Sequence, residues 1–227
     1  MSALGILGGT FDPIHFGHLR LAQEMAEGIG LSEVRFVPAG CPPHRAPPAA
    51  SAPHRLAMVE RAVAANPLFC VDPREIERGG PCYTVDTLCG LRAELGATRP
   101  LCLLMGADAF LGLATWHRWQ EIFDLAHVAV AFRPGFPEGA WMDTMPEALR
   151  TMLRTRRETD PAALRQGAAG RVYAQPITPL DISASRIRSA LEAGRNPRYL
   201  LPDAVLDYIQ RHQLYVRPPR QTPTPGA

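Results

Sequence analysis

Lysine is absent from the sequence, so all 24 of its basic residues are arginine. This absence excludes a Schiff-base lysine and the lysine of a P-loop, whereas arginine still offers phosphate a bidentate, permanently charged partner. Long hydrophobic runs are also absent: none approaches the roughly 18 residues that a membrane span needs, and the opening MSALGILGG lacks the basic start of a secretory signal. We therefore expect a cytoplasmic protein that does not enter a membrane.

Paired cysteines and a strong net charge are missing as well. The cysteines are odd in number and form no C-x-x-C pair, which disfavours a disulfide framework and a thiolate zinc site. The formal charge is only +2 and the arginines are spread along the chain, so we expect no nucleic-acid partner. The length of 227 residues suits one large domain and leaves the oligomeric state open, homo-oligomers included.

Short apolar runs alternate with longer amphipathic ones from residue 3 to about residue 130. ALGIL, VRFVPA, LCLLMG and HVAVAF are strand-like, and runs such as LRLAQEMAEGI and TVDTLCGLRAEL are helix-like. This alternation predicts an α/β fold, a Rossmann-like doubly wound parallel sheet with helices on both faces. We expect one domain over residues 1–216, with a variable, irregular surface insertion at about 135–170, a small C-terminal helical part at about 183–216 and a disordered tail at 217–227.

The stretch GGTFDPIHFGH, from Gly8 to His18, follows the first strand-like run and so lies where parallel sheets bind ligands. It is neither a dinucleotide fingerprint nor a P-loop. If a helix begins close to His15, then His15 and His18 share a face beside free backbone N–H groups, which attract anions. Gly8 and Gly9 would allow a bulky ligand to approach the strand. The stretch predicts a polyphosphate site.

Two simpler interpretations of the histidines stay open. H-x-x-H could be half of a metal site, although no third histidine or carboxylate of suitable spacing is close in the sequence. Either histidine could also be a structural residue.

A second stretch, ISASRIRSAL (182–191), has the features of a helix start that binds an anion. Ser183 can cap the helix, Ser185 lies in its first turn, and Arg188 would reach back to an anion, while Arg186 faces elsewhere. A plain helix start is the alternative. Together with the first stretch, it suggests a second phosphate clamp.

These stretches resemble known signatures. GGTFDPIHFGHL resembles the opening motif of the nucleotidyltransferase superfamily, and ISASRIR resembles its closing I-S-S-T-x-I-R motif. VPAGCPPHR, YTVDTL, GADAF followed by Trp116, and YLLPDAVLDYIQRHQLY resemble segments of bacterial nicotinate mononucleotide adenylyltransferases. The likeness extends over about residues 4–215. It implies transfer of the adenylyl group of ATP to nicotinate mononucleotide in NAD biosynthesis, giving nicotinate adenine dinucleotide and pyrophosphate.

The resemblance also implies roles for individual residues. Mg²⁺ would be the cofactor, held by the phosphates, so no protein metal ligand is expected. The implied catalytic residues are His15, His18 and Arg188. The implied ATP-binding residues are Gly8, Gly9, Thr10, Phe11, His15, His18, Arg45, Gly106, Asp108, Ile182, Ser183, Ser185 and Arg188. The implied residues for nicotinate mononucleotide are His44, Arg45, Tyr83, Thr84, Trp116 and Arg133.

The residues themselves suggest how the acceptor would be recognised. Trp116 offers a flat face to the nicotinate ring, and Thr84, at a predicted helix start, would place backbone N–H groups near the ring carboxylate. This arrangement would favour the acid over the amide. Alternatives stay open: Trp116 as a core residue beside Trp119, Tyr83 and Thr84 as a simple helix cap, and Arg133 as a surface arginine.

The sequence departs from the family pattern in three places. Arg45 replaces a lysine, Ala184 and Ser185 replace a Ser-Thr pair, and the segment at 135–170 has no counterpart in the motifs. Four other functions stay open. Two are related adenylyltransferases: one acting on nicotinamide mononucleotide, and a phosphopantetheine adenylyltransferase, whose motif usually has threonine at the position of His15. The others are a cytidylyltransferase, which should lack YTVDTL, and a nucleotide-binding regulator without turnover.

Overall fold

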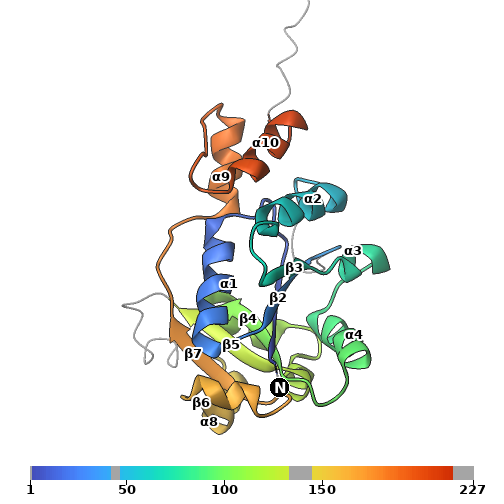
Figure 1. Ribbon diagram of the computed structural model, residues 1–227, viewed down its shortest axis with the longest axis vertical. Helices are drawn as coiled ribbons and strands as arrows, with labels where there is room; N and C mark the ends of the chain where they lie inside the picture. Colours follow the sequence, from blue (N-terminus) through green and yellow to red (C-terminus); the bar gives the residue numbers. More distant parts are fainter. Residues whose placement is uncertain (1, 42–46, 133–144, 217–227) are drawn as a thin grey trace, which may run out of the picture.

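A parallel sheet forms the centre of the computed structural model, which describes residues 2–41, 47–132 and 145–216 (Figure 1). Within these ranges the sheet has seven strands in the order β3-β2-β1-β4-β5-β7-β6, and each neighbouring pair is parallel. The strands are β1 (Leu4–Gly9), β2 (Glu33–Pro38), β3 (Phe69–Val71), β4 (Leu101–Gly106), β5 (His127–Phe132), β6 (Arg157–Glu158) and β7 (Val172–Pro176).

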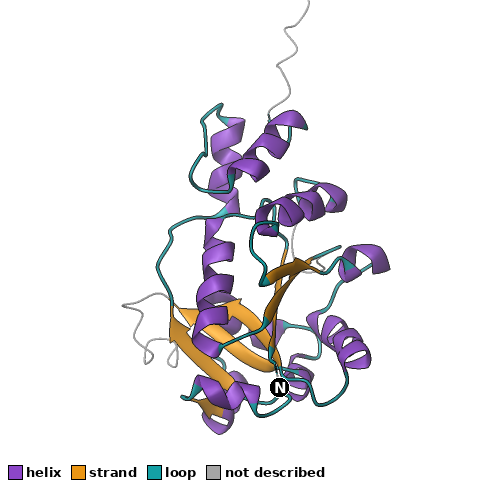
Figure 2. Cartoon of the chain, in the orientation of Figure 1, coloured by secondary structure: helices purple, strands orange, loops and turns teal. Residues whose placement is uncertain are grey.

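Helices surround the sheet, as the colouring by secondary structure shows (Figure 2). The α-helices described are α1 (Phe16–Ile29), α2 (Ala52–Val63), α3 (Arg74–Arg78), α4 (Thr84–Leu95), α5 (Ala107–Leu111), α6 (Ile122–Leu125), α8 (Glu147–Arg156), α9 (Ala184–Glu192) and α10 (Asp203–Arg211). Three 3₁₀ turns lie at η1 (Leu113–Thr115), η2 (Trp119–Glu121) and η3 (Pro161–Arg165).

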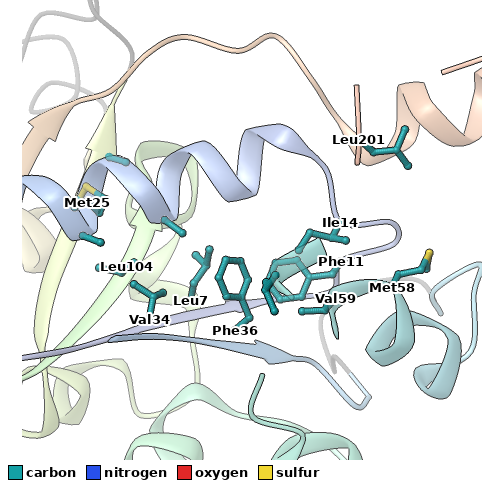
Figure 3. Packing of buried hydrophobic residues seen from close by; sticks show 14 of the residues in the cluster. Leu7, Phe11, Ile14, Met25, Val34, Phe36, Met58, Val59, Leu104 and Leu201 are labelled. Atoms are coloured by element: carbon teal, nitrogen blue, oxygen red, sulfur yellow. The ribbon is translucent and has the colours of Figure 1, made fainter. Parts of the chain in front are cut away.

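Two separate hydrophobic clusters show that helices cover both faces. One contains Met25 of α1 and Met58 of α2 (Figure 3), and the other contains Leu88 of α4. Strand β4 contributes to both, because Leu103 belongs to the second cluster and Leu104 to the first. Alternate residues of a strand point to opposite faces, so a strand buried on both sides is apolar throughout. The predicted doubly wound α/β fold is confirmed.

Several elements match the predicted runs to the residue. Strands β4 and β5 coincide with LCLLMG and HVAVAF, and α4 coincides with TVDTLCGLRAEL. The prediction omitted β3, α3 and β6, which span three, five and two residues. Segments this short do not complete a hydrophobic period, so only their packing in the folded chain defines them.

The segment predicted as a surface insertion is partly built into the fold. Within its described part, α8 buries Leu149 in a core cluster, η3 buries Leu164 in the other, and β6 pairs with β7 at the sheet edge. Apolar residues therefore anchor the described part of this segment to both faces of the sheet. Residues 133–144 and the tail at 217–227 lie outside the described residues, and the proposed domain boundaries stay a prediction.

The parallel arrangement brings the carboxyl ends of the strands to one edge. There β1 ends at Gly9, next to the end of β2, and β4 ends at Gly106. The segments that follow these strands therefore meet at that edge. In the part of the chain that the structure describes, no helix has the length and apolar character to span a membrane.

Candidate active site

A cavity of about 320 Å³ lies at the carboxyl ends of β1 and β4. Many residues of the predicted site line it: Gly8, Gly9, Thr10, His18, Tyr83, Thr84, Gly106 and Trp116. Its lining also includes residues that the sequence analysis did not select, namely Glu75, Cys82, Thr87 and His117. The cavity thus joins the two regions assigned to ATP and to the acceptor.

The two histidines of the first motif lie against each other at the start of α1. His15 is the N-cap residue of the helix, and its ring stacks on that of His18 with the centroids 3.8 Å apart and the planes at 25°. The backbone N–H of His15 donates to Nδ1 of His18 at 3.3 Å. Because Nδ1 accepts this bond, neutral His18 has its proton on Nε2 and can donate from there.

Burial keeps both histidines uncharged. It lowers the pKa of His15 to about 4, and His15 is only 6% exposed. It also lowers the pKa of His18 well below its usual value, and a charge on His15 would lower it further. Desolvation penalises the charged form of an imidazole, so both rings are neutral hydrogen-bond donors at pH 7 when the site holds no anion. An arriving polyphosphate would raise both pKa values.

Asp12 organises the turn that precedes α1. Its carboxylate accepts hydrogen bonds from the backbone N–H groups of Ala49 (2.7 Å) and Ala50 (3.0 Å) and from the Tyr215 hydroxyl (2.6 Å). Burial, and then the Asp12 carboxylate, raise the pKa of Tyr215, which therefore stays protonated and donates. The sequence analysis did not assign Asp12 to the site, although TFDP was part of the motif, because its partners are distant in sequence.

The structure brings Arg188 to the same turn. Its Nη1 donates to the carbonyl of Asp12 at 2.7 Å, and it lies 3.9 Å from an Asp12 carboxylate oxygen. The start of α9 is also close to α1, since the Ile182 carbonyl is 3.7 Å from where a Cβ on Gly17 would lie. The two motifs therefore lie side by side in the fold, with Arg188 anchored through the Asp12 backbone.

The predicted cap of α9 is present. Ser183 Oγ accepts from the Arg186 backbone N–H at 3.3 Å and lies 3.2 Å from Ser185 Oγ. The side chain of Arg186 pairs with Asp181 at 2.7 Å.

Arg55 is a structural part of the site that sequence patterns did not reveal. Its guanidinium, 1% exposed, donates to the carbonyls of Thr10 (2.8 Å), Gly40 (3.0 Å) and Ala50 (3.3 Å). Burial lowers its pKa. An arginine on the buried side of an amphipathic helix gives no local signal, because its three acceptors come from loops elsewhere in the chain.

The two glycines that end β1 lie in different surroundings. A Cβ on Gly8 would meet no atom within 4 Å, which fits the predicted approach of a ligand. A Cβ on Gly9 would lie 2.8 Å from the Phe11 ring. The absent side chain of Gly9 thus makes room for Phe11, whose ring in turn packs edge-on against His18 with centroids 5.1 Å apart. Gly9 also lines the cavity, so the expected approach of a ligand to both glycines stays a prediction.

Seven predicted residues that the structure describes do not line this cavity. Phe11, His15 and Arg188 lie in or against the turn that precedes α1, and Ile182, Ser183 and Ser185 lie at the start of α9. Asp108 is exposed in α5 and does not line the cavity. His44, Arg45 and Arg133 lie outside the described residues.

Trp116 lines the cavity and also packs against the second core cluster, so it combines the two roles considered for it. Trp119 packs against Phe123 with centroids 6.1 Å apart. Tyr83 has its ring 4.4 Å from that of His117, at the acceptor end.

Metal ligands are not gathered in the described residues, where no group of three His, Cys, Asp or Glu side chains could hold an ion. Both oxygens of the Asp12 carboxylate already accept hydrogen bonds. The side chains of these segments do not form a cage for Mg²⁺.

Fold and site together define the class of protein. The Cytidylyltransferase-like family matches residues 6–190, and the chain belongs to that family. A probable nicotinate-nucleotide adenylyltransferase of Dechloromonas aromatica (strain RCB) is 53% identical over 93% of this chain and 97% of its own length. One from Pseudomonas aeruginosa (strain UCBPP-PA14) is 50% identical over 95% and 98%. Within the family, the chain is thus one of the nicotinate-nucleotide adenylyltransferases.

Solved structures share the fold. Plasmodium falciparum nicotinic acid mononucleotide adenylyltransferase complexed with NaAD has a TM-score of 0.70 at 17% identity, covering 95% of this chain and 98% of its own. The same enzyme complexed with APC gives a TM-score of 0.68 over the same shares.

Proposed function

We propose that this chain joins the adenylyl group of ATP to nicotinate mononucleotide, releasing pyrophosphate and giving nicotinate adenine dinucleotide for NAD biosynthesis. One observation carries the proposal. Neutral His18, whose ring stacks on that of His15, lines a cavity that continues to Thr84 and Trp116. The high identity to nicotinate-nucleotide adenylyltransferases supports the same reaction.

At the phosphate end, His18 would donate from Nε2 to the triphosphate, and His15 would stabilise the charge that develops on the transferring phosphoryl group. Arg188, held at the Asp12 carbonyl, would neutralise phosphate charge. Donors fixed before the reaction stabilise a developing charge without reorganisation. We assign the remaining contacts to ATP as well: Gly8, Gly9, Thr10, Phe11, Arg45, Gly106, Asp108, Ile182, Ser183 and Ser185.

At the acceptor end, Trp116 would stack on the nicotinate ring, and the first turn of α4, at Thr84, would receive the ring carboxylate. Backbone N–H groups at a helix start are unpaired and favour anions. Tyr83, His44, Arg45 and Arg133 would complete the binding of the nucleotide. This arrangement supports a preference for the acid over the amide.

The reaction itself requires positioning more than covalent participation. A phosphate oxygen of nicotinate mononucleotide attacks the α-phosphorus of ATP, a bond forms between them, and the bond from that phosphorus to the bridging oxygen breaks, so pyrophosphate leaves. Holding the two anions in line accounts for much of the acceleration in such transfers. Mg²⁺ would enter bound to the phosphates. We further propose that the enzyme works in the cytoplasm, which agrees with the free state of its cysteines in the described chain.

Pyrophosphate release tests the proposal. The wild type and His18→Ala are compared with ATP, Mg²⁺ and one of three acceptors: nicotinate mononucleotide, nicotinamide mononucleotide or phosphopantetheine. We expect turnover with nicotinate mononucleotide, a loss of about 100-fold or more in His18→Ala, and little change in His54→Gln, whose ring contacts Tyr208 instead. ATP binding without turnover on any acceptor would favour the regulator.

A further inference from the structure

Glu75 is a buried carboxyl group in the cavity that the proposed reaction does not use. It lies in α3, is 8% exposed, and lines the cavity together with Cys82, Thr84 and Thr87. Acidic side chains are seldom buried in this way without a partner that justifies the position. Its place beside α4 puts it at the acceptor end.

Glu75 is tied to the first turns of α4. Thr87 Oγ1 donates to Oε1 of Glu75 at 2.6 Å, and Thr87 itself is 3% exposed. Thr84 and Thr87 are three residues apart on the helix and both line the cavity, so they share the face that Glu75 touches. The carboxyl group therefore lies against the helix start where we place the carboxylate of the acceptor.

Packing prevents Glu75 from moving away. Its backbone carbonyl accepts from the Cys82 thiol at 3.5 Å. On the other side, a Cβ at Gly40 would come within 2.4 Å of the same carbonyl oxygen. The backbone of Glu75 is thus enclosed between two loops.

The nearest charges around Glu75 come from its own helix and from the loop before it. Burial has the largest effect on the pKa of Glu75, which it raises; the Arg78 guanidinium acts to lower this pKa, and the Asp72 carboxylate acts to raise it. On its own helix Arg78 is exposed, and before that helix Asp72 is already paired with Arg74 at 2.7 Å.

The other elements contribute little positive charge. On α4, Asp86 lies 3.6 Å from Arg118. The Cys82 thiol donates to the Glu75 carbonyl, and the exposed His117 imidazole lines the same cavity. Burial raises the pKa of Glu75, with hydrogen bonding to Thr87 acting in the opposite direction.

We propose that Glu75 is a specificity-determining residue for the acceptor, and that it carries a proton whenever a substrate carboxylate occupies the start of α4. Two carboxylates in one small site cannot both remain ionised without strong repulsion. Ionised Glu75 would oppose the acid while tolerating the amide, which has no charge at that position. The acid preference should therefore decline as pH rises. This inference rests on the proposed function, because it takes the acceptor to be nicotinate mononucleotide.

The test compares acid and amide acceptors across pH. The KM for nicotinate mononucleotide and the inhibition constant of nicotinamide mononucleotide are measured from pH 6 to 9, and their ratio cancels the titration of the shared phosphate group. In the wild type the ratio should rise by up to about tenfold per pH unit above the pKa of Glu75. In Glu75→Gln it should be independent of pH, since the amide keeps the bond from Thr87 without a charge.

Two controls isolate the carboxyl group. Glu77→Gln alters an exposed glutamate on the same helix and should retain the wild-type rise. His117→Gln removes the exposed imidazole of the cavity lining, and the rise should also persist there. A rise that disappears in His117→Gln and survives in Glu75→Gln would overturn the proposal.

A second variant covers the case in which Glu75→Gln does not fold, as judged by circular dichroism. Thr87→Val removes the hydrogen bond to Glu75 that favours the ionised carboxyl group. The ratio of the KM for the acid to the inhibition constant of the amide should then begin to rise at higher pH. An unchanged rise would contradict the proposal. Absence of turnover with any acceptor would refute the proposed function, whereas turnover with a pH-independent ratio in the wild type would refute only the role of Glu75.

Discussion

At the scale of single residues, His15 links the site to the stability of the protein. Its pKa is about 4 in the folded chain and about 6.5 when unfolded, so the folded protein binds fewer protons between these values. The stability contributed is therefore complete above pH 6.5 and is lost as pH falls toward 4. We expect His15 to reduce the free energy of unfolding by about 2 kcal/mol between pH 7 and pH 5.

Urea unfolding at the two pH values measures this loss. The pKa shifts of His18 and the buried His127 have the same sign, so His15→Gln should lose the His15 part of the pH dependence and retain the parts of these two. A dependence in His15→Gln equal to that of the wild type would contradict the assignment of a neutral, buried His15.

Gly8 and Gly9 provide a matched pair of substitutions. Gly8→Ala adds a methyl group where no atom lies within 4 Å, so folding should be unaffected. The methyl group would occupy part of the space that we assign to ATP. We expect the KM of this variant for ATP to rise about tenfold, which is about 1.4 kcal/mol. Gly9→Ala forces the methyl group against Phe11 and should lower stability by about 1–3 kcal/mol. Thermal unfolding and ATP kinetics on both variants separate the two effects. A stability loss in Gly8→Ala with a raised KM for ATP only in Gly9→Ala would contradict both assignments.

At the scale of elements, helix α2 holds two loops of the site through Arg55. Replacing it with methionine keeps much of the volume but leaves three carbonyls without their donor. We expect a loss of about 3 kcal/mol or more in the free energy of unfolding, because each buried, unsatisfied group is costly. Denaturant titration measures it.

The control for Arg55 lies on the same helix. Glu60→Gln changes an exposed residue and should alter stability by less than about 0.5 kcal/mol. If Arg55→Met were as mild as this control, the three carbonyls would have to find other donors.

Helices and strands were predictable where a hydrophobic pattern extends over the whole element. LCLLMG and HVAVAF are buried on both faces and were recognisable as strands, while β3 and α3 are too short to establish a period. The histidine pair was predictable for a similar reason, since residues three apart share a face at a helix start. Asp12, Arg55 and Glu75 were missed because their partners lie in segments that only the fold brings together.

At the scale of the whole molecule, the segment after α10 contacts the turn that precedes α1, because Tyr215 binds Asp12 there. Tyr215→Phe removes the hydroxyl that donates to Asp12 at 2.6 Å. Because the acceptor is a charged group, we expect a loss of about 2 kcal/mol in stability. We also expect a fall in turnover, since Asp12 positions the turn that carries His15. Unfolding and pyrophosphate release measure the two effects.

Tyr199→Phe is the corresponding control. This tyrosine is 81% exposed, so loss of its hydroxyl should change neither quantity. Equal effects in the two variants would show that the Tyr215 bond has no special role.

The bond between Tyr215 and Asp12 also has a consequence for synthesis of the protein. The ribosome adds Asp12 to the chain 203 positions before Tyr215. The turn at the phosphate end therefore lacks one of its partners until nearly all of the described chain has been translated. A chain that ends between α10 and Tyr215 would contain both histidines and all the described strands. The turn that precedes α1 would nevertheless lack the hydrogen bond from Tyr215 to Asp12.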